Sequence, residues 1–174
     1  MCMSIRRVLG LLFASPVTFL TVFLYVLPFT WFGWYEYIGW YGLKETYEMS
    51  QLAFSPVWVY RKGKGPKFLQ QYWEKWAGHC VGTAVVLREH PTTSKKAQAT
   101  LVHEMHHVHQ MHLLGFFQPV LYAISTLLAK CSGEDSYLAN IFEMSARRAA
   151  GQIVDYKSFV QGAKFAQPKE EKRS

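Results

Sequence analysis

The sequence has few cysteines, and they do not pair in any recognised pattern. Its 174 residues include three cysteines, Cys2, Cys80 and Cys131, and no two of them form a CxxC pair. Such an odd and sparse set gives no disulfide framework and leaves the redox compartment undetermined. A bridge between Cys80 and Cys131 is an open alternative that no spacing supports.

Formal charge is absent from a long stretch near the N-terminus. The run from Val8 to Ile38 carries no charge before Glu36. About 20 apolar residues at a rise of 1.5 Å cross a hydrocarbon core of about 30 Å. The run is too long for an ordinary signal peptide and lacks a small-residue cleavage site. We therefore expect a retained transmembrane helix, with a cleaved signal or a buried core helix as the alternatives.

Aromatic residues gather at the C-terminal end of this run and just beyond it, where an interfacial belt would lie. They are Trp31, Trp34, Tyr35, Tyr37, Trp40 and Tyr41. Residues 1–42 are accordingly interpreted as a single-pass membrane anchor with its aromatic belt, so a lipid bilayer is an expected partner. Arg6 and Arg7 favour an inside N-terminus, with the remainder of the chain periplasmic or otherwise extracytoplasmic. The basic cluster from Arg61 to Lys67 lies on the other flank and weakens that bias.

Acidic residues are too few to balance the basic ones, and the formal net charge is +7. A basic balance can indicate nucleic-acid binding, but no basic groove motif with interleaved aromatic residues accompanies it. Attraction to anionic headgroups beside an anchor explains the charge more simply. We expect no nucleic-acid partner.

Periodicity and turn residues predict a mostly helical α+β domain over residues 43–166, followed by a disordered tail at 167–174. A helix from Lys95 to Leu114 is favoured by an N-cap at Thr93 or Ser94 and by Gly115 at its end. The best strand candidate lies within Gly82–His90. Three further helices are expected: an amphipathic one at Leu43–Ser55, a short one at Phe68–His79 and one at Tyr137–Tyr156. The apolar stretch Leu113–Ala129 is marginal as a membrane span, and we interpret it as a buried or interfacial helix.

Histidine is concentrated in one place, since five of the seven histidines lie in the segment LVHEMHHVHQMHL, Leu101–Leu113. On a helix, His103 and His107 are only about 40° apart, so two imidazoles can meet one ion. Together with Glu104 they form the pattern HExxH. In that pattern two neutral imidazoles hold Zn²⁺, and the glutamate takes a proton from the attacking water. The alternative is a helix whose histidines are solvated or satisfied in the core.

A catalytic zinc site needs a third protein ligand and an open fourth position. Glu143 lies on its own predicted helix, 36 residues after His107, which leaves room for the chain to turn back. The predicted strand before the active-site helix could hold a peptide along its edge by main-chain hydrogen bonds. Arg147, one turn after Glu143, could pair with it.

The remaining histidines have simpler interpretations. His79 and His90 are expected in loops, and His106, His109 and His112 at exposed polar positions.

A carboxylate-bridged di-iron centre would need two ExxH motifs on different helices. Glu104 and His107 supply one, and the chain has no other.

HEMHHVHQ followed by NIFEMSARRAAG resembles the gluzincin branch of zinc peptidases, specifically its small, minimal members with HExxH and a downstream ExxA. The resemblance covers roughly Gly82 to Gly151. It implies a short strand region and an active-site helix packed on a glutamate-bearing helix, with His103, His107 and Glu143 as zinc ligands and Glu104 as general base. Gln110 is a common accompaniment in such members.

The resemblance does not assign the group that stabilises the oxyanion, for which Tyr137, Tyr122 and Tyr156 are all candidates, with Tyr137 preferred. It also leaves the usual acidic partner of the first histidine unidentified. The expected function is a membrane-anchored zinc metallopeptidase that hydrolyses peptides or proteins. The alternative is an inactive zinc-binding membrane or structural protein that retains the metal site.

Overall fold

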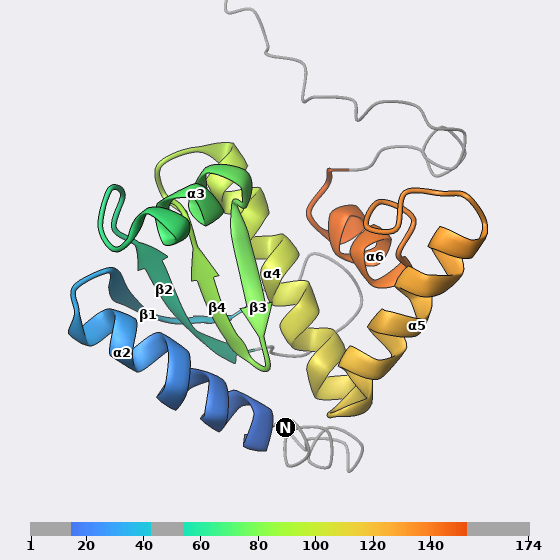
Figure 1. The fold of residues 1–174 in the computed structure, drawn as a ribbon, viewed down its shortest axis with the longest axis horizontal. Coiled ribbons are helices and arrows are strands. Elements are labelled where there is room, and N and C mark those ends of the chain that lie inside the picture. Colours follow the sequence, from blue (N-terminus) through green and yellow to red (C-terminus); the bar gives the residue numbers. More distant parts are fainter. Residues whose placement is uncertain (1–14, 43–53, 153–174) are drawn as a thin grey trace, which may run out of the picture.

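The computed structural model describes residues 15–42 and 54–152, which form an α+β fold with more helix than strand (Figure 1). A four-stranded sheet lies between two helical layers. Helix α4 (Lys95–Leu114) packs on one face of the sheet, where Met105 and Val108 meet Val57, Val85 and Leu87. The N-terminal helix and α3 (Lys67–Lys75) cover the other face. Helices α5 (Phe117–Cys131) and α6 (Ile141–Ala149) pack beside α4 and each other.

The strand order is β1-β2-β4-β3, which leaves β1 and β3 at the edges of the sheet. Strands β1 (Tyr35–Gly42) and β2 (Phe54–Tyr60) are antiparallel, β2 runs parallel to β4 (Ala84–Leu87), and β3 (Gly78–Val81) is antiparallel to β4. All four residues of β4 are buried because helices cover both faces of the sheet there.

The strand expected within Gly82–His90 exists as β4, but its expected role was wrong. An interior strand pairs on both sides and offers no free edge to a peptide. That edge belongs to β3, in a segment where we expected the end of a helix. Helix α3 stops at Lys75, and Gly78 starts a strand instead of ending a helix.

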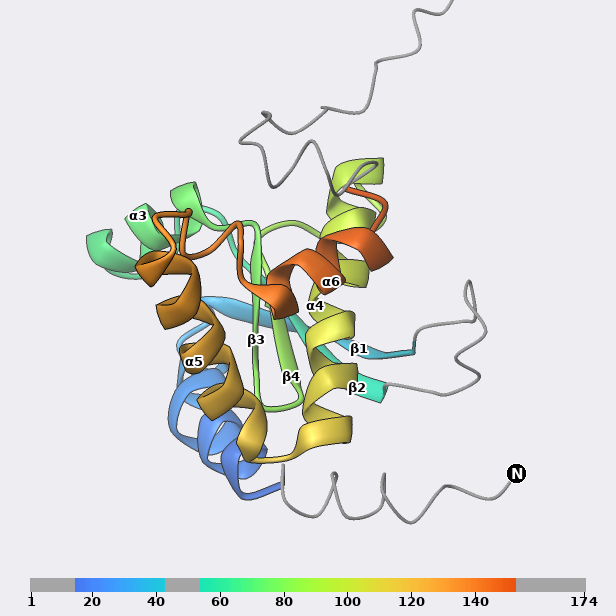
Figure 2. The same cartoon turned by 90° about the vertical axis from the view of Figure 1, so that its right-hand side faces the viewer.

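The N-terminal helix (Ser15–Trp31) includes a π-helical stretch, η1 (Val22–Val26), followed by α2 (Leu27–Trp31). One side of this helix belongs to the protein core, since Val26 is fully buried in a cluster with Tyr35 and Trp73. The burial of Tyr35 corrects its expected place in an interfacial belt: β1 carries it into the core. In Figure 2 α5 lies toward the viewer and partly overlaps the N-terminal helix, but Figure 1 shows the two helices apart, with α4 and the sheet between them.

Within residues 15–42 and 54–152, no single helix has both the length and the apolarity of a membrane span. Helices α4 and α5 reach those limits only as a pair, across a bend of 114°. The transmembrane anchor therefore stays a prediction.

The bounds predicted for the long helix are confirmed, because its end signals are local. The Ser94 hydroxyl accepts a hydrogen bond from the Ala97 amide at 3.0 Å, and Gly115 ends the helix with a φ of +56°. Helix α6 is shorter than the predicted 137–156. The predicted helix at Leu43–Ser55 lies outside the described residues except for its last two, which begin β2. Cys80 and Cys131 are free thiols.

Candidate metal centre

Two imidazoles meet on one side of α4. His103 and His107 are one helical turn apart, and their Nε2 atoms lie 3.2 Å from each other. Both residues are at most 9% exposed. Helix α4 can bury them because the sheet covers one of its sides and α6 another.

The third group comes from α6. The Glu143 carboxylate reaches both rings, with Oε2 at 3.3 Å from His103 Nε2 and Oε1 at 3.2 Å from His107 Nε2. The three ligand atoms lie within 4.8 Å of one another, and this buried group could hold a metal ion. Two imidazole nitrogens and one carboxylate oxygen form a donor set that divalent transition metals bind. The three predicted ligands thus converge, although they come from two separate helices.

Helix α6 is held in place by Asn140, which is fully buried at its N-cap. The Asn140 side-chain oxygen accepts from the Phe142 amide at 2.9 Å, and its Nδ2 donates to the Tyr122 carbonyl and to the Thr126 hydroxyl at 3.1 and 2.8 Å. One side chain therefore caps α6 and ties it to α5. Because Glu143 lies in the first turn of α6, these bonds also fix the position of its side chain relative to α5.

Polar neighbours orient two of the three groups. The Tyr122 hydroxyl donates to Glu143 Oε1 at 2.9 Å. Gln110 Oε1 lies 2.8 Å from His107 Nδ1, while Gln110 Nε2 donates to the Phe142 carbonyl at 3.1 Å. Such partners fix the ring orientation and tautomer of a metal-binding histidine. By contrast, His103 Nδ1 is buried and has no hydrogen-bond partner among the described residues, so no acidic partner for the first histidine is found there.

Arg147 lies beside Glu143, as its position one helical turn later predicted. Its Nη2 is 3.8 Å from Glu143 Oε2, and its guanidinium stacks 4.6 Å from the centre of the Tyr137 ring. Tyr137 also contacts Trp76 edge to face, at 5.6 Å between ring centres. Tyr137 thereby lines the same cavity as the three converging groups. Tyr156 lies outside the described residues.

Glu104 faces this cavity from the turn of α4 that carries His103, and it is 6% exposed. Burial raises its pKa, although the two imidazoles act in the opposite direction. Strand β3 packs directly over it, since a Cβ added at Gly78 would lie 3.1 Å from Glu104 Cγ and Oε1. Glycine is therefore the residue that lets the edge strand approach the carboxylate.

Charge in the metal-free cluster is shared between Glu143 and the imidazoles. Burial acts to raise the pKa of Glu143, but hydrogen bonds from His103 and His107 hold it well below its ordinary value. Burial acts to lower the pKa of His107, but its hydrogen bond to Glu143 and the nearby carboxylates raise it overall.

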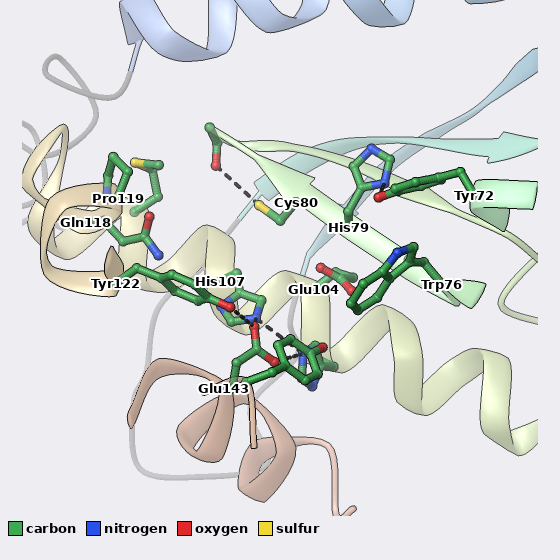
Figure 3. Close-up of a pocket in the computed structure, with 15 residues that line it drawn as sticks. Tyr72, Trp76, His79, Cys80, Glu104, His107, Gln118, Pro119, Tyr122 and Glu143 are labelled. Carbon is green, nitrogen blue, oxygen red and sulfur yellow. Dashed lines mark hydrogen bonds and ion pairs between the residues drawn. The ribbon is translucent and has the colours of Figure 1, made fainter. Parts of the chain in front are cut away.

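A cavity of about 480 Å³ opens above these groups (Figure 3). Helices α4, α5 and α6 supply Glu104, His107, Tyr122 and Glu143 to its walls, and the sheet side supplies an aromatic wall. That wall consists of Tyr72, Trp76 and His79. None of the three was singled out from the sequence as a functional residue, because they belong to three different local contexts.

The structure corrects the expectations for several other histidines. His79 is in β3, where its ring stacks on Trp73 and burial lowers its pKa to about 4. His109 and His112 are each 7% exposed, so their expected solvent exposure was wrong. His106 is half-buried and lies 2.6 Å from the Ser145 hydroxyl of α6. The three histidines of α4 are less exposed than expected because other elements surround this helix, and the sequence of the helix alone does not reveal those neighbours. His90 lies in a loop, as expected.

Comparison of the chain with protein-family models, with curated proteins and with solved structures gave no match.

Proposed function

We propose that this chain is a zinc-dependent peptidase, with His103, His107 and Glu143 as zinc ligands and Glu104 as general base. One observation carries the proposal: two imidazoles and a carboxylate from separate helices converge at 3.2–3.3 Å beside a second, buried carboxylate in an open cavity. The likeness of the HExxH and ExxA motifs to the gluzincin peptidases supports it.

A zinc ion bound there would polarise the scissile carbonyl and acidify the attacking water. Glu104 takes the proton from that water and passes it to the leaving amine. Its raised pKa makes the carboxylate a stronger base toward that water, and a catalytic group works best when its pKa lies near the working pH. Tyr122 donates its hydroxyl to Glu143 at 2.9 Å. Tyr137 also lies beside Glu143, but it is 36% exposed and the more accessible of the two, so we assign it to the developing oxyanion.

Strand β3 supports a peptide substrate. It is an edge strand, it runs past Glu104, and three of its residues, Gly78, His79 and Cys80, line the cavity. An extended peptide could therefore add to the sheet by main-chain hydrogen bonds while its scissile bond lies over α4. The charge-free run before Glu36 supports a membrane anchor. We place the site on the periplasmic or otherwise extracytoplasmic side of that membrane.

The test is Glu104→Gln in the full chain, measured with a peptide library and by elemental analysis. We expect about one zinc per chain in both proteins, and a loss of at least 10²-fold in cleavage for the variant. His106→Gln, on the flank of the same helix, is the matched control and retains activity. Cleavage at the wild-type rate by Glu104→Gln would contradict the mechanism. Zinc without turnover in the wild-type chain would favour the alternative, an inactive metal-binding protein.

A further inference from the structure

Helix α5 turns its polar side toward the protein and its apolar side outward, which is the reverse of a helix on the surface of a water-soluble domain. Its inward side is polar, with Gln118 and Ser125 buried and Tyr122 and Thr126 half-buried toward the site. Its outward side carries large apolar residues at helical spacing. These are Phe117, Val120, Leu121, Ile124, Leu127 and Leu128, which are 39–62% exposed.

Helical spacing makes these side chains one continuous stripe, since each lies three or four residues from another. Isolated exposed apolar residues are ordinary on protein surfaces, but contiguous apolar patches mark contact with a partner. The described residues leave this stripe uncovered. Leu127 and Leu128, at 60% and 62% exposed, lie near its C-terminal end.

Charge decides what kind of partner the stripe fits. No Asp, Glu, Lys or Arg occurs from Met105 through Ala129, and the first charged residue after the stripe is Lys130, at the last turn of α5. Protein interfaces are enriched in arginine and are bordered by a polar rim. A hydrocarbon interior excludes charge, and a lysine at the end of the stripe can extend to the headgroups.

The N-terminal helix presents a second surface of the same kind. Phe19, Phe23 and Leu24 are 58–67% exposed, and this helix contains no charged residue. Figure 1 shows the sheet and α4 between this helix and α5, so the two apolar surfaces are separate.

We propose that the outward stripe of α5 lies in the interfacial layer of a lipid bilayer. Tyr122 and Gln118 on the inner side of the same helix line the cavity, so membrane contact through α5 holds the cavity within about one helix diameter, roughly 10 Å, of the lipid. The proposal does not depend on the metal chemistry, and it adds to the N-terminal run a second, separate contact.

Depth-resolved fluorescence tests this directly in the full chain. With Cys2, Cys80 and Cys131 replaced by serine, Leu128→Cys is labelled with an environment-sensitive NBD dye. Arg148→Cys, exposed on α6, is the matched control. Both are bound to vesicles of phosphatidylcholine and phosphatidylglycerol, with and without a nitroxide on the acyl chain. Circular dichroism confirms that both labelled chains are folded.

At position 128 we expect a blue-shifted emission that the acyl-chain nitroxide quenches almost fully, and at position 148 an emission close to that of the dye in water. A water-like emission at 128 in vesicle-bound protein would overturn the proposal, and so would failure of the chain to bind vesicles. A blue shift at 128 that is already present without lipid, with a dimer in sedimentation, would assign the stripe to a second copy of the chain instead. Peptide cleavage enters none of these outcomes, so they are independent of the proposed hydrolase activity.

Discussion

The hydrogen bond from Tyr122 to Glu143 provides a sharp test of how the site is built. Tyr122→Phe removes a single hydroxyl and leaves the ring in place. The lost bond is 2.9 Å long and charge-assisted, because its acceptor is a carboxylate whose pKa is held low. Hydrogen bonds to charged groups contribute about 1.5–3 kcal/mol.

If Glu143 is a metal ligand, losing this hydrogen bond lowers the affinity of the site for the metal. Partners that orient a ligand typically change affinity by about 10–100-fold, which corresponds to about 1.4–2.7 kcal/mol. The two ranges overlap over most of their width. Tyr122 is only half-buried, so water can replace part of the lost bond. We therefore expect the zinc dissociation constant of Tyr122→Phe to rise by about 10–30-fold.

The assay is competition with a chromophoric chelator at neutral pH. Tyr72→Phe is the control, since it also removes a tyrosine hydroxyl from the cavity wall, but that hydroxyl bonds to His79 at 2.9 Å. We expect it to leave zinc affinity within about threefold of the wild type. Equal zinc affinity in Tyr122→Phe and wild type would refute the reasoning, because Glu143 would then not depend on α5 for its orientation.

Further predictions concern stability and pH. Asn140→Ala removes the N-cap of α6 and leaves buried polar groups on α5 without their donor. The free energy of unfolding, measured by chemical denaturation, should therefore fall by about 2–4 kcal/mol. A loss below about 0.5 kcal/mol would contradict the role given to this side chain. In the metal-free chain the raised pKa of His107 contributes stability that is present below about pH 6.5 and is lost as pH rises through the folded pKa. The lowered pKa of Glu143 contributes stability that is lost as pH falls below about 4.5. Thermal melts in EDTA should therefore show the wild type losing more stability than Glu143→Gln between about pH 6 and pH 8; parallel pH profiles for the two proteins would contradict the coupling.

The parts of this fold that could be predicted are those with local signals. Ser94 and Gly115 mark the ends of α4 in the sequence itself, and an i, i+4 pair of histidines meets on any helix. Glu143 was predicted from its motif and spacing, and α6 brings it to the pair.

The parts that were missed depend on neighbours distant in sequence. Strand β1 could not be separated from a membrane-interface belt by its composition, because aromatic residues suit both settings. Only its pairing with β2 buries Tyr35. His109 and His112 are buried because α4 is enclosed by other elements, which no pattern within the helix reveals. The short strand β3 carries a glycine that packs on Glu104, and before the fold was known that glycine indicated only the end of a helix.

Zinc K-edge X-ray absorption of the purified full chain tests the central claim most directly. The account predicts one zinc with four nitrogen or oxygen neighbours at about 2.0–2.1 Å and a scattering pattern of two imidazoles, one of which disappears in His107→Ala. A sulfur neighbour at about 2.3 Å would indicate a cysteine ligand, such as Cys80 in the same cavity, and would contradict the ligand set of His103, His107 and Glu143.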